Sequence, residues 1–292
     1  MKPATFNYHR PDTVKEALAM HAAGEDARFI AGGQSLVPMM ALRLARPSDL
    51  IDLNTIDDLS GIVHSATHTR IGAMTRQQDL AADAFLCEQV PAMRAIIDSV
   101  GHPGTRTRGT IGGSLCHADP AAEIPALLLA LDADVLVASV GGESRRVDVE
   151  RFFNGYFETT LRADELLTEI RIPHVSQRSM GFDEVTLRSA DFAVAGAIAC
   201  ADRDAEGGLD SIRVATFALG DRPQRLREVE TAVIDAQGDP GAIGSAAHLT
   251  ADLISPFDEP HLSATYRRKL GVTVVRRALE SALGSTLQAE ER

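Results

Sequence analysis

The chain has 292 residues, 45% of them hydrophobic, so it is long enough for two or three modest domains with buried cores. Its formal net charge of −12 argues against nucleic acid or an anionic membrane as a partner, because both rely on a basic surface. The N-terminus lacks an apolar secretory segment, and the apolar run at 124–140 is too short to span a bilayer. The three cysteines, Cys87, Cys116 and Cys200, form no metal-binding pattern. We therefore expect a cytoplasmic protein that binds no metal ion and inserts into no membrane.

A strand–helix–strand unit is predicted at the start of the chain. A strand at 4–9 precedes a helix that begins near Thr13. A short apolar strand at 28–31 leads into a glycine loop and a helix at 36–44, and a strand at 50–53 follows. A glycine loop inside such a unit is typical of one half of a nucleotide-binding domain.

Alternating hairpins and helices are predicted from there to about residue 172. Alternation of apolar and polar residues indicates the strands, and apolar residues that recur every three or four positions indicate the helices. The expected elements are a hairpin at 61–64 and 69–73, helices at 75–82 and 91–99, a turn at 101–104, a helix at 127–131, and strands at 134–139, 143–148 and 165–172.

Polar residues after Pro173 predict a domain boundary near residue 176. Three strands at 181–187, 193–202 and 212–219 follow, then helices near 225–236, 241–253 and 262–283. We expect an N-terminal domain at 1–176 with subdomains of about 1–56 and 57–176, a C-terminal domain at 177–286, and a tail at 287–292.

Two glycine loops about 80 residues apart carry most of the functional information: Ala31-Gly32-Gly33-Gln34-Ser35 and Thr110-Ile111-Gly112-Gly113-Ser114. A Gly-Gly step lets the backbone approach a ligand and aim consecutive N–H groups into one concavity. Two such loops suggest one dinucleotide held from two sides. The Rossmann fingerprint, the P-loop and the hydrolase nucleophile elbow are all absent from the sequence.

The two loops resemble the FAD-binding signatures of the molybdenum hydroxylase flavoprotein subunits. This family includes the medium subunits of aerobic carbon monoxide dehydrogenases and the FAD domains of xanthine dehydrogenases. The resemblance runs in the family's order through Phe29–Met40, Arg108–Pro125, Ser189–Ala193 and Ser263–Arg268. It implies an α+β protein with a FAD-binding fold of the vanillyl-alcohol-oxidase type in two subdomains. A small α+β C-terminal domain, built of a three-stranded antiparallel sheet with helices, would follow.

The resemblance also implies the residues that bind FAD. One side of the pyrophosphate falls to Ala31, Gly32, Gly33, Gln34, Ser35 and Leu36, and the other to Thr110, Ile111, Gly112, Gly113 and Ser114. Glu123 would lie near the ribityl or ribose hydroxyls, Leu166 and Leu167 under the flavin ring, and Phe192 beside it. For Glu123 a helix-start acid remains an alternative role, and for the three apolar residues ordinary core packing does.

Two positions depart from the family pattern. Ser114 stands where many relatives have Asn, which changes one side-chain contact to the cofactor. Asp183 stands where some members place a basic residue near the flavin. A basic group would stabilise a reduced anionic flavin, and Asp would not, so use of NAD as acceptor is less assured.

The function that the resemblance implies is the FAD-carrying electron-transfer subunit of a heteromeric molybdenum hydroxylase. A large partner would hold the molybdenum–pterin centre and a small partner two [2Fe–2S] clusters, assembled as a dimer of heterotrimers. No residue here is expected to act as a catalytic acid or base. Two alternatives stay open: a stand-alone FAD-dependent oxidase or dehydrogenase of the same fold, and a flavin-free structural subunit. The substrate, and the acceptor among oxygen, quinone and NAD, are open as well.

Overall fold

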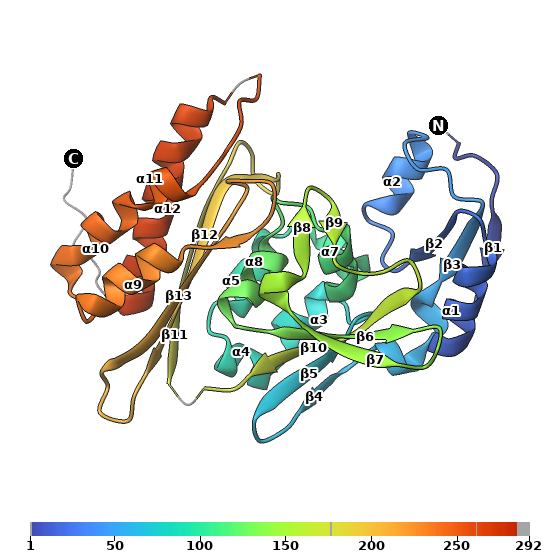
Figure 1. Cartoon of the computed structure of the whole chain (residues 1–292), viewed down its shortest axis with the longest axis horizontal. Coiled ribbons are helices and arrows are strands. Elements are labelled where there is room, and N and C mark those ends of the chain that lie inside the picture. Colours follow the sequence, from blue (N-terminus) through green and yellow to red (C-terminus); the bar gives the residue numbers. More distant parts are fainter. Residues whose placement is uncertain (1, 176, 261, 285–292) are drawn as a thin grey trace.

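The computed structural model describes residues 2–175, 177–260 and 262–284. Three units lie in a row, from the N-terminal unit in blue to the C-terminal unit in orange and red (Figure 1). The expected boundary at residue 176 and the expected tail at 287–292 fall outside the described residues. In the part of the chain that is described, no helix combines the length and the apolar character needed to cross a membrane.

The N-terminal unit is a three-stranded parallel sheet with the order β1-β3-β2. Thr13 caps its main helix by accepting a hydrogen bond from Glu16 N, and that helix packs Ala17 and Leu18 against Ile51. The elements are β1 (Asn7–His9), α1 (Val14–Ala23), β2 (Ala27–Ile30), α2 (Leu36–Ala41) and β3 (Asp49–Asp52), followed by 3-10 turns at Leu53–Thr55 and Asp57–Leu59.

The central unit is a five-stranded antiparallel sheet with the order β4-β5-β10-β6-β7, and helices pack against it to form the largest core. The strands are β4 (Ile62–His64), β5 (His68–Gly72), β6 (Asp134–Ser139), β7 (Ser144–Asp148) and β10 (Glu165–Pro173), with a small hairpin of β8 (Phe153–Gly155) and β9 (Glu158–Thr159). The helices are α3 (Gln77–Ala82), α4 (Ala84–Gln89), α5 (Met93–Ser99), α6 (Pro103–Arg108), α7 (Ile111–His117) and α8 (Glu123–Ala130).

The C-terminal unit is an antiparallel sheet with helices on the face away from the central unit (Figure 1). Its strands are β11 (Arg178–Thr186), β12 (Ala193–Arg203), β13 (Leu209–Phe217) and β14 (Gln224–Arg225). Its helices are α9 (Arg227–Asp235), α10 (Pro240–His248), α11 (Thr250–Leu253) and α12 (Ala264–Leu283). Strand β12 is buried on both faces, because α8 covers one face and α12 the other.

The structure corrects several expected elements. The C-terminal sheet has four strands rather than three, since β14 pairs with β13 over two residues, too few to show alternation. The turn expected at 101–104 is the beginning of α6, where Pro103 occupies the first helical turn. The helix expected at 127–131 begins at Glu123, and the one expected at 241–253 is divided into α10 and α11.

A buried ion cluster joins the C-terminal sheet to the end of α8. Asp202 is 4% exposed and lies between the guanidinium groups of Arg178 and Arg213. Arg213 also donates from Nε to the Ala130 carbonyl at 2.9 Å and lies 3.5 Å from Asp132. Three strands of the C-terminal unit, β11, β12 and β13, are thereby tied to the end of a helix of the central unit.

We expect Asp202→Ala to destabilise the chain strongly, because it leaves the buried Arg178 without a counter-charge and Arg213 with only the exposed Asp132, 3.5 Å away. The free energy of unfolding should fall by about 3–5 kcal/mol, measured by urea denaturation. Glu150→Ala is the matched control, because it removes the exposed pair between Glu150 and Arg227 and should cost less than about 1 kcal/mol. Equal losses in the two variants would contradict this role of the cluster.

Candidate functional site

The two glycine loops meet in the structure, although they are far apart in the sequence. A Cβ on Gly32 would lie 2.3 Å from the carbonyl oxygen of Arg108 and 2.9 Å from the Cα of Gly109. A Cβ on Gly113 would lie 3.5 Å from the Cβ of Ala31. The first loop is therefore in direct backbone contact with the segment that enters the second, and only glycine fits at position 32.

The first loop turns its carbonyl groups toward the protein. Three consecutive carbonyls accept hydrogen bonds: Ala31 from Asn54 Nδ2 at 2.9 Å, Gly32 from Gln34 Nε2 at 3.2 Å, and Gly33 from Val37 N at 3.0 Å. In a trans peptide the carbonyl of one residue and the N–H of the next point in opposite directions. The N–H groups of the loop therefore point away from these partners.

Those N–H groups are free. Within the described ranges, the backbone N–H groups of residues 32–35 have no hydrogen-bond acceptor. Gly33 has a φ of +74°, a left-handed conformation that curls successive N–H groups toward one side. The row begins at buried Gly32 and reaches the surface at Gln34 and Ser35, and such unpaired donors are suited to oxygen atoms of a phosphate group.

The second loop is built differently, because its backbone donors are already used. Thr110 caps α7, and the four following N–H groups bond within the protein: Ile111 to Thr75 O, Gly112 to Ala73 O, Gly113 to Thr110 Oγ1, and Ser114 to Thr110 O. Gly112 is buried, and a Cβ there would lie 2.6 Å from that of Ala73, so its glycine serves packing. Gly113 is closely packed as well, since a Cβ there would lie 2.7 Å from Thr110 Oγ1. What this loop offers a ligand is the half-buried side chain of Ser114.

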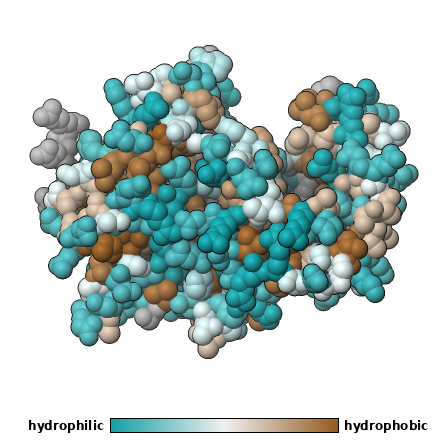
Figure 2. All heavy atoms as spheres, viewed as in Figure 1, coloured by the Kyte–Doolittle hydropathy of each residue, from teal (hydrophilic) through white to brown (hydrophobic). Residues whose placement is uncertain are grey.

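Helix α7 carries two side chains whose pKa values the surrounding protein shifts. Cys116 is exposed to solvent, yet the protein around it raises the pKa of its thiol to about 12. Burial likewise lowers the pKa of His117, whose ring is 5.0 Å from that of Phe157. Figure 2 shows the surface hollowed between the lobe that carries α2 and the central part of the molecule.

Glu123 is the first residue of α8 and is only 7% exposed. Burial, with smaller contributions from Glu184 and Asp119, raises the pKa of its carboxyl to about 7. Glu184 lies on β11 of the C-terminal unit. The charge of this candidate site residue therefore depends on both large units.

Leu166 and Leu167 are neighbours on β10 and point to opposite faces of the strand. Leu166 is 5% exposed and packs in the N-terminal core with Met74, whereas Leu167 is 2% exposed and packs in the central core. The structure does not bring the two leucines to one side of a ligand.

Phe192 is 67% exposed and borders a hollow of about 310 Å³ between the central and C-terminal units. Aromatic side chains of Tyr156, Phe157 and Phe257 also line it. Arg267, in the segment Ser263–Arg268, closes the hollow from α12. It is 3% exposed, pairs with Glu259 at 2.7 Å and lies 5.4 Å from the ring centre of Phe257.

Three polar residues at the site were not among those expected from the sequence. Arg267 could have been found from the resemblance at 263–268. Arg76 and Asn54 had no signal of their own, since each sits at the start of an ordinary turn or helix. Both contact the glycine loops, at the carbonyls of Arg108 and Ala31.

Two family models together match nearly the whole chain. One is described as the FAD binding domain in molybdopterin dehydrogenase and covers residues 4–175. The other is described as the CO dehydrogenase flavoprotein C-terminal domain and covers residues 181–282.

Similar proteins cover the chain almost end to end. The 6-hydroxypseudooxynicotine dehydrogenase complex subunit alpha of Paenarthrobacter nicotinovorans is 38% identical over 97% of this chain and 96% of its own length. Caffeine dehydrogenase subunit beta of Pseudomonas sp. (strain CBB1) is 34% identical over the same shares. A solved carbon monoxide dehydrogenase from Hydrogenophaga pseudoflava superposes with a TM-score of 0.93 at 32% identity, over 98% of this chain and 99% of its own. The expected α+β fold and FAD as cofactor are confirmed, and the chain belongs to the FAD-binding subunits of the molybdenum hydroxylase family of oxidoreductases.

Proposed function

We propose that this chain passes electrons from the [2Fe–2S] clusters of a small partner subunit through FAD to an external acceptor. The substrate would be oxidised at a molybdenum–pterin centre on a large partner subunit. When bound, FAD supplies the ability to take up electrons singly and release them in pairs. The residues of this chain bind and orient the cofactor and take no part in the oxidation of the substrate.

One observation carries the proposal: the first loop, whose N–H groups at residues 32–35 are free, lies directly against the segment that enters the second loop, where a Cβ on Gly32 would come 2.3 Å from the Arg108 carbonyl oxygen. Free backbone donors beside the start of helix α7 suit the pyrophosphate of a dinucleotide. We assign one side to Ala31, Gly32, Gly33, Gln34, Ser35 and Leu36, and the other to Thr110, Ile111, Gly112, Gly113 and Ser114.

The names of the relatives support a role that does not depend on substrate. They mention a nicotine derivative, caffeine and carbon monoxide, three chemically unrelated compounds. A fold kept across such different substrates fits a subunit that handles electrons rather than substrate. It fits a stand-alone oxidase less well, since that enzyme would need a substrate pocket of its own.

The remaining assignments concern the flavin end of the cofactor. The exposed rings of Phe157 and Phe192 offer faces on which a flavin ring can stack. Glu123 would accept hydrogen bonds from cofactor hydroxyls when ionised. Leu166 and Leu167 lie on opposite faces of β10, so we propose that at most one of them contacts the ring.

The electron-transfer role is tested by mixing the FAD-loaded full chain with its chemically reduced small partner under anaerobic conditions. The flavin absorbance should bleach, and the iron–sulfur absorbance should recover at the same rate. A chain that carries no flavin when purified with its partners would favour the structural alternative. A chain that oxidises a small alcohol or amine without partners would favour the stand-alone enzyme.

Gly32→Ala is expected to abolish FAD retention, because the added Cβ would force the first loop away from the backbone at Arg108 and Gly109. The FAD content of the purified chain should fall by about tenfold or more, with an unchanged circular dichroism spectrum. Gly104→Ala in α6 is the matched control, since a Cβ there meets no atom within 4 Å. Full FAD occupancy in Gly32→Ala would refute the assignment of this loop.

Glu123 predicts a specific pH dependence of stability. Its pKa is about 7 in the folded chain, against 4.5 for an ordinary glutamate, so the folded state binds more protons than the unfolded state between these pH values. The free energy of unfolding should therefore fall as pH rises through this window. Glu123→Gln removes the cost of ionising a buried carboxyl. It should stabilise the cofactor-free chain by up to about 3 kcal/mol at pH 8 and much less at pH 5. Urea denaturation at both pH values measures this, with exposed Glu143→Gln as control. A gain that is the same at both pH values would contradict the pKa assignment.

A further inference from the structure

We propose that Arg76, oriented by Asn54, is a positioning residue of the FAD site: it fixes both glycine loops and places a positive charge beside the pyrophosphate. The inference rests on the proposed function, because it takes the two loops to be the pyrophosphate site. It goes beyond it by naming a cation outside both loops on which their spacing depends.

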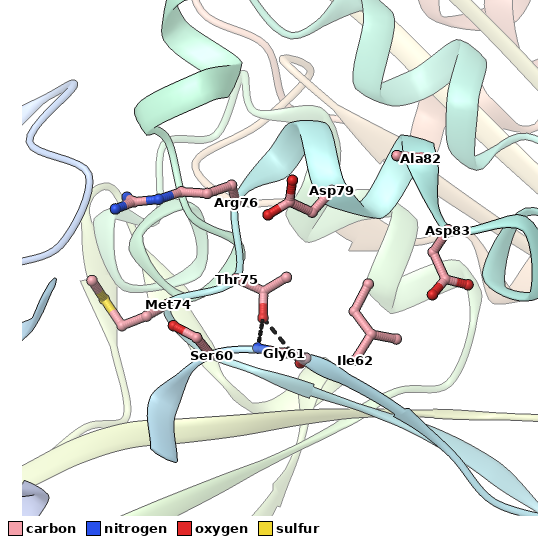
Figure 3. Close-up of a pocket in the computed structure, with 9 residues that line it drawn as sticks. All are labelled: Ser60, Gly61, Ile62, Met74, Thr75, Arg76, Asp79, Ala82 and Asp83. Carbon is pink, nitrogen blue, oxygen red and sulfur yellow. Dashed lines mark hydrogen bonds between the residues drawn. The ribbon is translucent and has the colours of Figure 1, made fainter. Parts of the chain in front are cut away.

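One guanidinium group connects three separate segments. Arg76 immediately precedes α3, and its NH1 donates to the Arg108 carbonyl at 2.5 Å. Its NH2 donates to Asn54 Oδ1 at 2.6 Å. Asn54 in turn donates from Nδ2 to the Ala31 carbonyl at 2.9 Å. Figure 3 shows Arg76 extending away from Ile62 and Asp83 of the neighbouring pocket.

The bonds of Arg76 act on the point where the loops touch. The Arg108 carbonyl that it holds is the same oxygen against which Gly32 packs. The Ala31 carbonyl is held toward Asn54, so the next N–H, that of Gly32, points the opposite way. Arg76 and Asn54 thus set both the spacing of the loops and the direction of the first free donor.

Asn54 is held in the orientation that this role needs. Its backbone N–H and its amide Nδ2 both donate to Asp52 Oδ1, the first at 2.9 Å. Tyr8 donates its hydroxyl to the other oxygen of Asp52. The Asn54 amide therefore presents its NH₂ group to Asp52 and Ala31 and its oxygen to Arg76. If the amide were flipped, its NH₂ group would face the N–H donors of Arg76, and its oxygen would face two acceptors.

Arg76 also brings a charge that no carboxylate neutralises at close range. Within residues 2–175, 177–260 and 262–284, no carboxylate oxygen lies within 4.0 Å of its guanidinium nitrogens. Burial and the nearby Arg108 lower the pKa of Arg76, and the more distant carboxylates of Asp79 and Asp52 oppose this shift without reversing it. Since it carries five N–H donors, it retains donors beyond the two bonds above for a phosphate oxygen.

The test compares Arg76→Gln, Arg76→Lys and a matched control in the full chain. Arg70→Gln is the control, because Arg70 is an exposed arginine on β5 whose partner Glu169 lies 3.5 Å away. The FAD dissociation constant is measured by fluorescence titration at several salt concentrations. Arg76→Gln should raise the Kd by about tenfold or more, Arg76→Lys by less, and Arg70→Gln not measurably.

The salt dependence separates positioning from a merely structural role. Removal of a charge that faces the pyrophosphate should flatten the rise of Kd with salt, and urea unfolding of the cofactor-free chain should stay as in the wild type. The proposal would be overturned if Arg76→Gln bound FAD more weakly but kept the wild-type dependence of Kd on salt and unfolded at a lower urea concentration. An unchanged Kd would overturn it as well. Failure of the wild type to bind FAD would instead contradict the proposed function itself.

Discussion

The contact between the bare backbone of Gly32 and the Arg108 carbonyl is the constraint on which the candidate site depends. A Cβ at position 32 would lie 2.3 Å from that oxygen, so any side chain there must separate the N-terminal unit from the central unit. The contact brings β2 and its loop to the entrance of α7. The loop with free N–H groups from one unit and the glycine loop from the other are therefore neighbours, with a Cβ on Gly113 only 3.5 Å from that of Ala31.

The two glycine loops have similar sequences, but different backbone groups of each are hydrogen-bonded to the protein. In the first, the carbonyls bond to protein and the N–H groups of residues 32–35 remain free. In the second, the N–H groups of residues 111–114 are all bonded, because Thr110 caps α7 and the backbone at Ala73 and Thr75 accepts the rest. The first loop can therefore attract an anion through its free donors, whereas the second loop is a rigid helix start whose donors are occupied. In the proposed site, the first loop would attract the phosphate group and the second would limit its position.

Patterns within a single segment were predictable, and pairings between segments were not. The strand before Gly32, the helix after Ser35 and the family itself follow from local alternation and motif order. The hydrogen bond of Asn54 to Ala31 and that of Arg76 to Arg108 join residues that carry no local pattern. Equally, the expectation for Leu166 and Leu167 ignored the alternation of β10, and β14 is too short to alternate at all.

The C-terminal unit is part of the site rather than an appendage to it. Helix α8 is buried from Glu123 to Ala130, because the central core lies on one side and strands β12 and β13 on the other. Both units therefore shield the carboxyl of Glu123, at the start of α8, from water. The carboxylate of Glu184 on β11 further disfavours the ionised form of Glu123. At the other end of α8, Arg213 of the C-terminal sheet holds the Ala130 carbonyl. The same sheet thus fixes the helix and influences the ionisation of the acid at its first residue. If Glu123 contacts the cofactor as we propose, a shift of the C-terminal unit would change the charge of the site as well as its shape.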